Sequence, residues 1–194
     1  MELFEERGYA RTTVEDIAVR AGLTERTFFR YFTDKREVLF SGSSALEALI
    51  VETIGAAPAS VAPLTAVTRA FEGLAPWFES RRGHSRKRRT VIAAHAELGE
   101  RELIKLSTLA AAIAAILRKR GLAAQTAALV AETGIAIFKN ALERWADDTR
   151  AQNLAVHVGA AVAALQEATA GMVPLPSSSR GSAAARRTPP KVRR

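Results

Sequence analysis

The sequence predicts an all-α protein. Apolar residues make up 48% of the 194 residues, and helix-favouring alanine and leucine are common among them. Apolar positions recur at helical spacing, whereas strand-like alternation of useful length is missing from the sequence. Glycine, proline and capping residues divide the pattern into successive helices. We therefore expect short N-terminal helices followed by a bundle of longer ones.

Composition narrows the class of protein. The sequence has no cysteine, which excludes disulfides, thiolate metal sites and thiol nucleophiles and favours a cytoplasmic location. No apolar run reaches the roughly 18 residues that span a membrane, so we expect no membrane partner. The three histidines are scattered, and the sequence has no phosphate-binding glycine loop and no nucleophile elbow. We expect no enzymatic activity, no metal and no cofactor.

Helix signals are clearest near the N-terminus. A first helix over residues 2–7 should end at Gly8. Thr13 and Asp16 form a capping signal for a helix over 14–21, and Thr24 is a good N-cap for a helix over 25–31. Leu23 should pack beneath the intervening turn. One stripe of the second helix should be buried, formed by Val14, Ile17, Ala18 and Ala21.

The helices over 14–21 and 25–31 make a helix-turn-helix. In the segment TERTFFRYFTDK, residues 24–35, Phe28 and Phe32 share one face and should pack against the preceding helix. The other side chains point outward or lie at the rim, namely Glu25, Arg26, Thr27, Phe29, Arg30 and Tyr31. These are groups that read base edges and contact phosphates, which favours DNA binding. A subunit or interdomain contact through Phe29 and Tyr31 remains the alternative.

The run GYARTTVEDIAVRAGLTERTFFRYFTDKREVLF resembles the DNA-binding domain of the tetracycline-repressor (TetR) family of bacterial transcription regulators, over about residues 3–40. The resemblance implies an all-helical homodimer. Its N-terminal three-helix helix-turn-helix domain would read the major groove of double-stranded DNA at a pseudo-palindromic operator. Its C-terminal helical bundle would bind a small-molecule effector and dimerise.

The resemblance also assigns roles to residues of the helix pair. Base-edge or groove contacts are implied for Glu25, Arg26 and Phe29. Phosphate contacts are implied for Thr13, Thr24, Thr27, Tyr31 and Lys35. Two interpretations remain open for Arg30, a phosphate contact or a solvated side chain. Glu25 departs from the pattern, because an acid beside phosphates is repelled unless it meets a cytosine amine or pairs with a neighbouring arginine.

A second departure lies at the start of the chain. The family has a longer segment before Leu3-Phe4, and a helix of one and a half turns is a poor wall for a domain core. We expect that the first helix is truncated and that translation starts upstream of Met1. The predicted organisation is a helix-turn-helix domain over residues 1–42, an effector-binding and dimerisation domain over 43–171, and a disordered basic tail over 172–194.

Helices in the C-terminal part are expected at about 34–54, 63–80, 87–98, 100–120, 124–148 and 151–170. The runs RKRRTVIAAHAELGERELIKL and IFKNALERWADD are similar to actinobacterial TetR regulators with an acyl-CoA-like effector domain, which implies a fatty-acyl or CoA-like effector. Core packing is the alternative for each candidate pocket residue. The candidates are Phe71, Trp77, Phe78, His95, Phe138 and Trp145.

Charge is distributed unevenly. The formal net charge is +8, yet residues 1–40 carry seven basic and eight acidic side chains. The run Arg81–Arg89 and the tail from Pro174 each carry six basic and no acidic residues. The run could bind phosphates of a CoA-like effector, touch DNA flanks, or be a solvated loop and helix start. The tail could add salt-sensitive DNA attraction or be unstructured.

These observations predict a sequence-specific transcription regulator, a repressor that a small-molecule effector releases from its operator. The alternative is a dimeric helical small-molecule-binding protein that has lost DNA binding, which the truncated first helix and the acidic balance of residues 1–40 keep open. The last two helices could pair with their copies as a four-helix dimer interface. Small residues there would allow close approach, namely Ala127, Ala128, Gly134, Ala160, Ala161 and Ala164.

Overall fold

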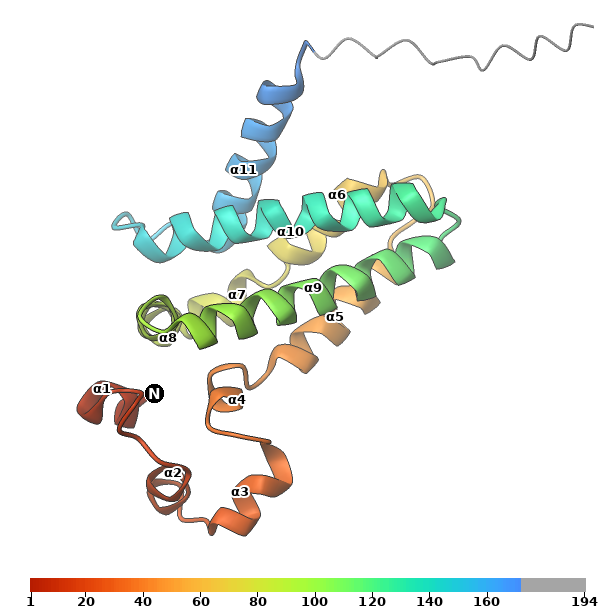
Figure 1. Ribbon diagram of the computed structural model, residues 1–194. Helices are drawn as coiled ribbons and strands as arrows, with labels where there is room; N and C mark the ends of the chain where they lie inside the picture. The colour runs from red at the N-terminus through yellow and green to blue at the C-terminus, as the bar shows by residue number, and fades with distance from the viewer. Residues whose placement is uncertain (172–194) are drawn as a thin grey trace, which may run out of the picture.

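The computed structural model describes residues 1–171, which form α-helices joined by turns, with no strand in that range. This confirms the predicted all-α class. Four short helices come first: α1 (Glu2–Arg7), α2 (Val14–Arg20), α3 (Glu25–Tyr31) and α4 (Arg36–Leu39). They lie beneath the bundle that the later helices form (Figure 1). The predicted basic tail lies outside the described residues.

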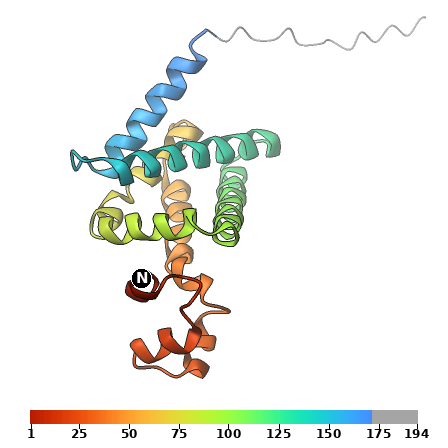
Figure 2. The ribbon, with the colours of Figure 1, turned by 60° about the vertical axis from the view of Figure 1, so that its left-hand side comes forward.

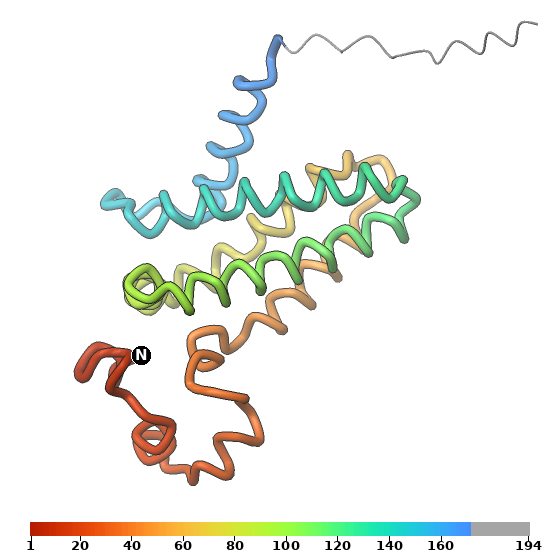
Figure 3. Tube along the Cα trace, viewed as in Figure 1, coloured from red at the N-terminus to blue at the C-terminus, as the bar shows by residue number. Residues whose placement is uncertain are grey.

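Seven helices build the bundle. They are α5 (Ser43–Ala56), α6 (Pro63–Glu72), α7 (Ala75–Glu79), α8 (Arg82–Ala93), α9 (Ala96–Lys119), α10 (Ala124–Asp147) and α11 (Leu154–Thr169). Helices α9 and α10 run antiparallel and pack together, and the C-terminal half of α11 projects away from the rest (Figures 1 and 2). The Cα trace follows the same path (Figure 3). None of the helices between residues 1 and 171 combines the length and apolarity needed to cross a bilayer.

The main hydrophobic core fills the bundle between α5, α6, α9, α10 and α11. Phe71 stacks on Phe138 with ring centroids 4.5 Å apart, and Trp145 is almost completely buried beside them. Helices α6 and α10 cross closely at Gly134, where an added Cβ would lie 2.6 Å from Cγ1 of Val67. Only a residue without a side chain fits this crossing.

A second, smaller core joins the N-terminal helices to the bundle. Phe4, Tyr9, Leu39 and Phe40 come from the N-terminal part, and they pack with Ile92 and Leu98 from α8 and α9. All six are buried. The N-terminal unit therefore completes its hydrophobic core with residues of the bundle.

Two of the predicted long helices are interrupted. The helix expected over 34–54 ends as α4 at Leu39, and Gly42 adopts a left-handed φ of 87° before α5 begins. Glycine adopts this conformation without the strain that a Cβ would cause. The helix expected over 63–80 is divided at Gly73 and Leu74, because Pro76 has no N–H to donate to the carbonyl of Glu72.

The break between the next two helices also differs from the prediction. His95 is extended, with φ −137° and ψ 112°, so that α9 begins at Ala96. Helix α8 begins at Arg82, so the basic run is itself helical. Gly121 lies in the turn after α9, and the last helix begins only at Leu154, capped by the side chain of Asn153.

Candidate nucleic-acid interface

Local capping signals define the helix pair as predicted. The hydroxyl of Thr13 accepts a hydrogen bond from the backbone N–H of Asp16, and the Asp16 carboxylate accepts one from the N–H of Thr13. The hydroxyl of Thr24 accepts from the N–H of Thr27 and caps α3. Gly22, with φ 67°, forms the turn between the helices. Each cap satisfies a donor that the first helical turn leaves without a partner.

Phe28 anchors the recognition helix α3 to the domain. Its side chain is 3% exposed, and its ring lies 5.2 Å from the ring of Phe32, which sits just beyond the helix and is half-buried. The predicted stripe of α2 is only partly buried. Ala18 is fully covered, whereas Ala21 and Leu23 are exposed because α2 already ends at Arg20.

The outer side of α3 is open to solvent. We call it the reading face, and it consists of Glu25, Arg26, Phe29, Arg30 and Tyr31. Phe29 is 54% and Tyr31 66% exposed, which is unusual for aromatic rings in a folded domain. This exposure agrees with the outward orientation that helical spacing predicted.

Two features of the reading face bear on DNA contact. Arg26 and Glu25 form no ion pair with any residue of 1–171, so the Arg26 guanidinium keeps its donors free. The Arg30 guanidinium lies 4.9 Å from the Tyr31 ring centroid and donates a 2.9 Å hydrogen bond to the Tyr31 hydroxyl. Because that hydroxyl oxygen accepts, its own hydrogen can still be donated to a phosphate.

The threonines predicted to contact phosphate all lie at helix N-termini. Thr13 and Thr24 are exposed, and Thr27 is half-buried. The Thr13 hydroxyl lies 2.9 Å from a carboxylate oxygen of Asp16, so its hydrogen is already donated. The hydroxyls of Thr24 and Thr27 lie 3.0 Å apart, so one of the two hydrogens remains free. Their phosphate contacts stay predictions.

Lys35 differs from the prediction. Its Nζ donates to the carbonyl oxygens of Tyr9, Ala10 and Thr12 at 2.8, 3.3 and 2.9 Å, and it lies 4.5 Å from the Tyr9 ring centroid. An ammonium group has three donors, and all three are occupied within the protein. In this structure Lys35 therefore ties the α1–α2 loop to the start of α4 and has no donor left for a phosphate.

The acidic balance of residues 1–40 does not extend to the reading face. Most of the carboxylates there are paired: Asp16 with Arg7, Glu2 and Glu6 with Arg20, Asp34 with Arg36, Glu5 with Lys87, and Glu37 with Arg101 and Lys105. A hydrogen bond from Arg20 lowers the pKa of Glu6, and hydrogen bonds from Thr13 lower the pKa of Asp16. These charges are neutralised locally or directed at the bundle.

Four of the six residues predicted to line an effector pocket lie in the main core. Phe71, Phe78, Phe138 and Trp145 pack against one another in the main core, with centroid distances from 4.5 to 6.0 Å. The Trp145 indole N–H donates a 2.6 Å hydrogen bond to Glu79. Aromatic residues at helical spacing can belong to a hydrophobic core or line a pocket. These four residues pack in the core, as the alternative interpretation expected.

The other two pocket candidates lie elsewhere. Trp77 is partly buried against Phe78, with the Arg81 guanidinium 4.7 Å from its ring. His95 stands at the start of α9, and its ring lies 4.8 Å from that of Tyr9 in the N-terminal unit. His95 therefore belongs to the contact between the two parts of the chain.

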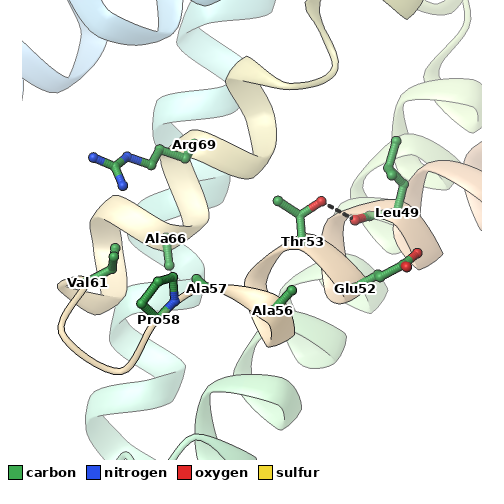
Figure 4. A pocket seen from close by; sticks show the side chains of 9 residues that line it. All are labelled: Leu49, Glu52, Thr53, Ala56, Ala57, Pro58, Val61, Ala66 and Arg69. Carbon is green, nitrogen blue, oxygen red and sulfur yellow. Dashed lines mark hydrogen bonds between the residues drawn. The ribbon is translucent and has the colours of Figure 1, made fainter.

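An open groove of about 470 Å³ lies between the C-terminal end of α5, the following loop and α6 (Figure 4). Its lining includes none of the predicted pocket residues. Apolar side chains dominate it, with Arg69, Glu52 and Thr53 as the polar members. The residues are Leu49, Glu52, Thr53, Ala56, Ala57, Pro58, Val61, Ala66 and Arg69.

The basic run forms the start of α8, and most of its side chains are exposed but hydrogen-bonded within the protein. On one side of α8, Arg86 donates to the carbonyls of Ala146 and Asp148 at 2.6 and 2.8 Å, and Arg89 donates to that of Glu143 at 3.2 Å. Cations here meet the negative end of the α10 dipole. The neighbouring Lys87 instead pairs with Glu5 at 2.9 Å.

Two further cations of the run have acidic partners within the protein. Arg82 pairs with Glu79, and Arg88 pairs with Glu102, so both positive charges are at least partly neutralised within the protein. The acidic partners Glu37 and Glu79 were missed at the level of sequence. Neither carries a local signal, because most of their partners are more than 60 residues away.

Comparisons with known proteins fit this geometry. Residues 1–41 match the family model described as "Bacterial regulatory proteins, tetR family". The HTH-type transcriptional regulator TcmR of Streptomyces glaucescens is 39% identical over 74 residues, which cover 38% of this chain and 33% of that protein. The match thus spans about a third of the length of this curated relative.

A solved structure, that of FadR, extends the likeness beyond the helix pair. FadR of Thermus thermophilus, a TetR family transcriptional repressor solved in complex with lauroyl-CoA, is 25% identical with a TM-score of 0.51 over 93% of this chain and 95% of that one. PfmR, a TetR family transcriptional regulator also from Thermus thermophilus, is 24% identical with a TM-score of 0.45 over 85% and 93%.

The family model matches the segment that carries the reading face, and the FadR likeness covers almost the whole chain. A helix-turn-helix on an all-helical bundle is also the architecture that the residues themselves predicted. Residues 1–41 therefore match the tetR family of bacterial regulatory proteins, and the chain as a whole is similar in fold to a TetR family repressor.

Proposed function

We propose that this protein is a sequence-specific DNA-binding transcription regulator, a dimeric repressor released from a pseudo-palindromic operator by a small-molecule effector. The observation that carries the proposal is the reading face of α3, where Arg26 has free donors and the Phe29 and Tyr31 rings are exposed. Arginine can donate two hydrogen bonds to a guanine edge, and exposed rings can contact thymine methyl groups. Glu25 would accept from a cytosine amine.

The names of the relatives support a regulator rather than an enzyme. The alternative, a ligand-binding protein without DNA binding, drew part of its support from the acidic balance of residues 1–40. That support weakens because the carboxylates concerned mostly have partners away from α3. A regulator works on the chromosome, so we infer a cytoplasmic location. We also divide the chain functionally near Gly42, into residues 1–42 and 43–171.

Dimerisation through α10 and α11 is part of the proposal. Ala127, Gly134 and Ala161 are buried within their own chain and cannot meet a second copy. Ala128, Ala160 and Ala164 remain exposed, together with the large apolar side chains of Leu129 and Val156, which are 68% and 47% exposed. Exposed apolar residues beside small ones suit a helix-packed interface between subunits.

We propose an effector with an acyl chain. FadR was solved with lauroyl-CoA, and the α5–α6 groove has apolar walls and a volume typical of ligand sites. Arg69 on α6 supplies a cation at its rim for a carboxylate or phosphate (Figure 4). Calorimetric titration with lauroyl-CoA and with free CoA tests this idea. Binding of lauroyl-CoA that survives both Leu49→Trp and Arg69→Ala would assign the effector to another site.

The DNA-binding part is tested by fluorescence anisotropy with the DNA upstream of the protein's own gene. We expect salt-sensitive binding that unlabelled random DNA does not displace at equal concentration. Arg118→Ala removes an exposed cation far from α3 and serves as the charge-matched control for Arg26→Ala. The alternative would be favoured if the wild type binds the upstream DNA no more tightly than random DNA and still binds acyl-CoA.

A further inference from the structure

A small set of charged side chains fixes α4 to the bundle. The Glu37 carboxylate accepts hydrogen bonds from Arg101 at 2.6 Å and from Lys105 at 3.0 Å. Arg101 and Lys105 are four residues apart and therefore share one face of α9. The Glu37 side chain is only 15% exposed. Burial raises the pKa of Glu37, but the hydrogen bonds from Lys105 and Arg101 outweigh it and hold the pKa below its ordinary value.

Arg88 holds the other end of the same helix. Its Nε donates a 2.7 Å hydrogen bond to the carbonyl of Leu39, the last residue of α4. Its guanidinium lies 4.9 Å from the ring centroid of Phe40 and pairs with Glu102 at 3.0 Å. Burial lowers the pKa of Arg88, and Glu102 counteracts this. We call Glu37, Arg88, Arg101 and Lys105 the α4 clamp.

The clamp matters because α4 has no rigid connection to the bundle through the backbone. It is four residues long, too short to keep a fixed direction by itself. The chain then turns at Gly42 before α5, so no continuous helix links α5 to α4. On its other side, α4 follows α3 after only residues 32–35. The direction of α3 therefore depends on how firmly α4 is held from the side.

We propose that Glu37 and Arg88 are positioning residues that set the half-site spacing this protein accepts, by fixing the direction in which α3 leaves the bundle. The inference rests on the proposed function. In a dimer, the distance between two reading helices must match the distance between two major grooves of the operator. A firmly held α4 permits one such distance, and a loosely held α4 permits several.

Charged contacts suit this role better than apolar ones. A partly buried ion pair contributes little net stability, because desolvation of the charges offsets their attraction. Its hydrogen bonds are nevertheless directional, and two of them on one carboxylate define an orientation. Loss of the charge on Glu37 should therefore widen the spread of orientations of α4, besides its effect on stability.

The test is selection from a DNA library in which two identical half-sites are separated by a varied number of base pairs. We expect the wild type to enrich one spacing and Glu37→Gln to reduce its preference over the next spacing by about tenfold, the effect of losing a charged hydrogen bond. Arg101→Gln, on the opposite side of the clamp, should broaden the profile less, because Lys105 still holds Glu37. The double variant should add little, because both changes remove the same contact.

Glu6→Gln is the matched control. It removes the same charge from the same N-terminal unit, but it breaks only the exposed pair with Arg20, so the spacing profile should stay sharp. A Glu37→Gln protein that binds DNA with the wild-type profile overturns the inference. Failure of the wild type to select any sequence counts instead against the proposed function.

A second measurement needs no DNA. Because the chain has no cysteine, Val19→Cys on α2 and Arg118→Cys on α9 can carry the only two spin labels of a molecule diluted in unlabelled protein. We expect a single narrow distance distribution that widens with Glu37→Gln and not with Glu6→Gln. Equal widths in all three proteins contradict a positioning role for Glu37.

Discussion

The ammonium group of Lys35 donates a 2.8 Å hydrogen bond to the carbonyl oxygen of Tyr9 and lies 4.5 Å from the centroid of its ring. With the carbonyls of Ala10 and Thr12, this contact binds the α1–α2 loop to the segment that follows α3. A cation that family resemblance assigns to DNA is here part of the domain's internal structure.

Lys35→Ala should accordingly destabilise the protein. It leaves three carbonyl groups without their charged donor, and we expect a loss of about 1–3 kcal/mol in the free energy of unfolding. Urea denaturation measures it. The dependence of DNA affinity on salt should keep its slope, because no phosphate contact is lost. If Lys35→Ala instead reduces the slope of DNA affinity against salt by about one unit and leaves stability unchanged, Lys35 contacts a phosphate.

Arg26→Ala should weaken specific DNA binding by about 1–3 kcal/mol and relax the preference at one base pair, if the guanidinium reads a guanine. The free donors of Arg26 motivate this expectation. Base-by-base competition with substituted operators measures the preference. Arg26→Lys keeps the charge but loses the planar pair of donors, so it should retain affinity for random DNA while losing discrimination. An unchanged base preference in both variants argues against base reading.

Gly134→Ala should destabilise the bundle. The added Cβ would lie 2.6 Å from Cγ1 of Val67, so α6 and α10 must move apart, at a cost of about 1–3 kcal/mol. Val67→Ala in the same chain removes the clashing methyl groups and should recover part of the loss. Thermal unfolding of the two single variants and the double variant measures the coupling free energy between Val67 and Gly134. Gly159→Ala, with no atom within 4 Å of the new Cβ, is the control.

Acid should loosen the contact between the two parts of the chain. The folded-state pKa of Glu37 is lowered, so its contribution to stability is present in full above the unfolded pKa and is lost as the pH falls through the folded pKa. Urea midpoints of the wild type and Glu37→Gln should differ at neutral pH. The difference should shrink below about pH 4.5, where glutamates protonate. A constant difference down to about pH 3 would mean that the charge of Glu37 is not involved.

Sequence reasoning succeeded where the signal was local. The caps at Thr13 and Thr24 involve residues three positions away, so their residue types alone predicted where α2 and α3 begin. The outward orientation of Phe29 and Tyr31 followed from helical spacing relative to Phe28. Family resemblance added the expected DNA roles, which the exposed side chains accommodate and which stay predictions.

Sequence reasoning failed where the outcome depends on distant partners. The six cations of 81–89 looked like free charge, but Lys87 pairs with a residue 82 positions away and Arg88 with the carbonyl of one 49 positions away. The helical spacing of Phe138 and Trp145 does not show whether other side chains fill the space next to them or leave a pocket. Helix breaks at Gly42 and His95 also escaped, because each depends on how the following helix docks.

The core that Phe4, Tyr9, Leu39 and Phe40 share with Ile92 and Leu98 limits how this protein can be rebuilt. A chimaeric regulator made by grafting residues 1–42 onto another effector domain would expose four large apolar side chains. We expect such a graft to aggregate unless the facing side of α8 and the start of α9 are transplanted with it. The transferable module is thus discontinuous in sequence, because it includes parts of α8 and α9 besides residues 1–42.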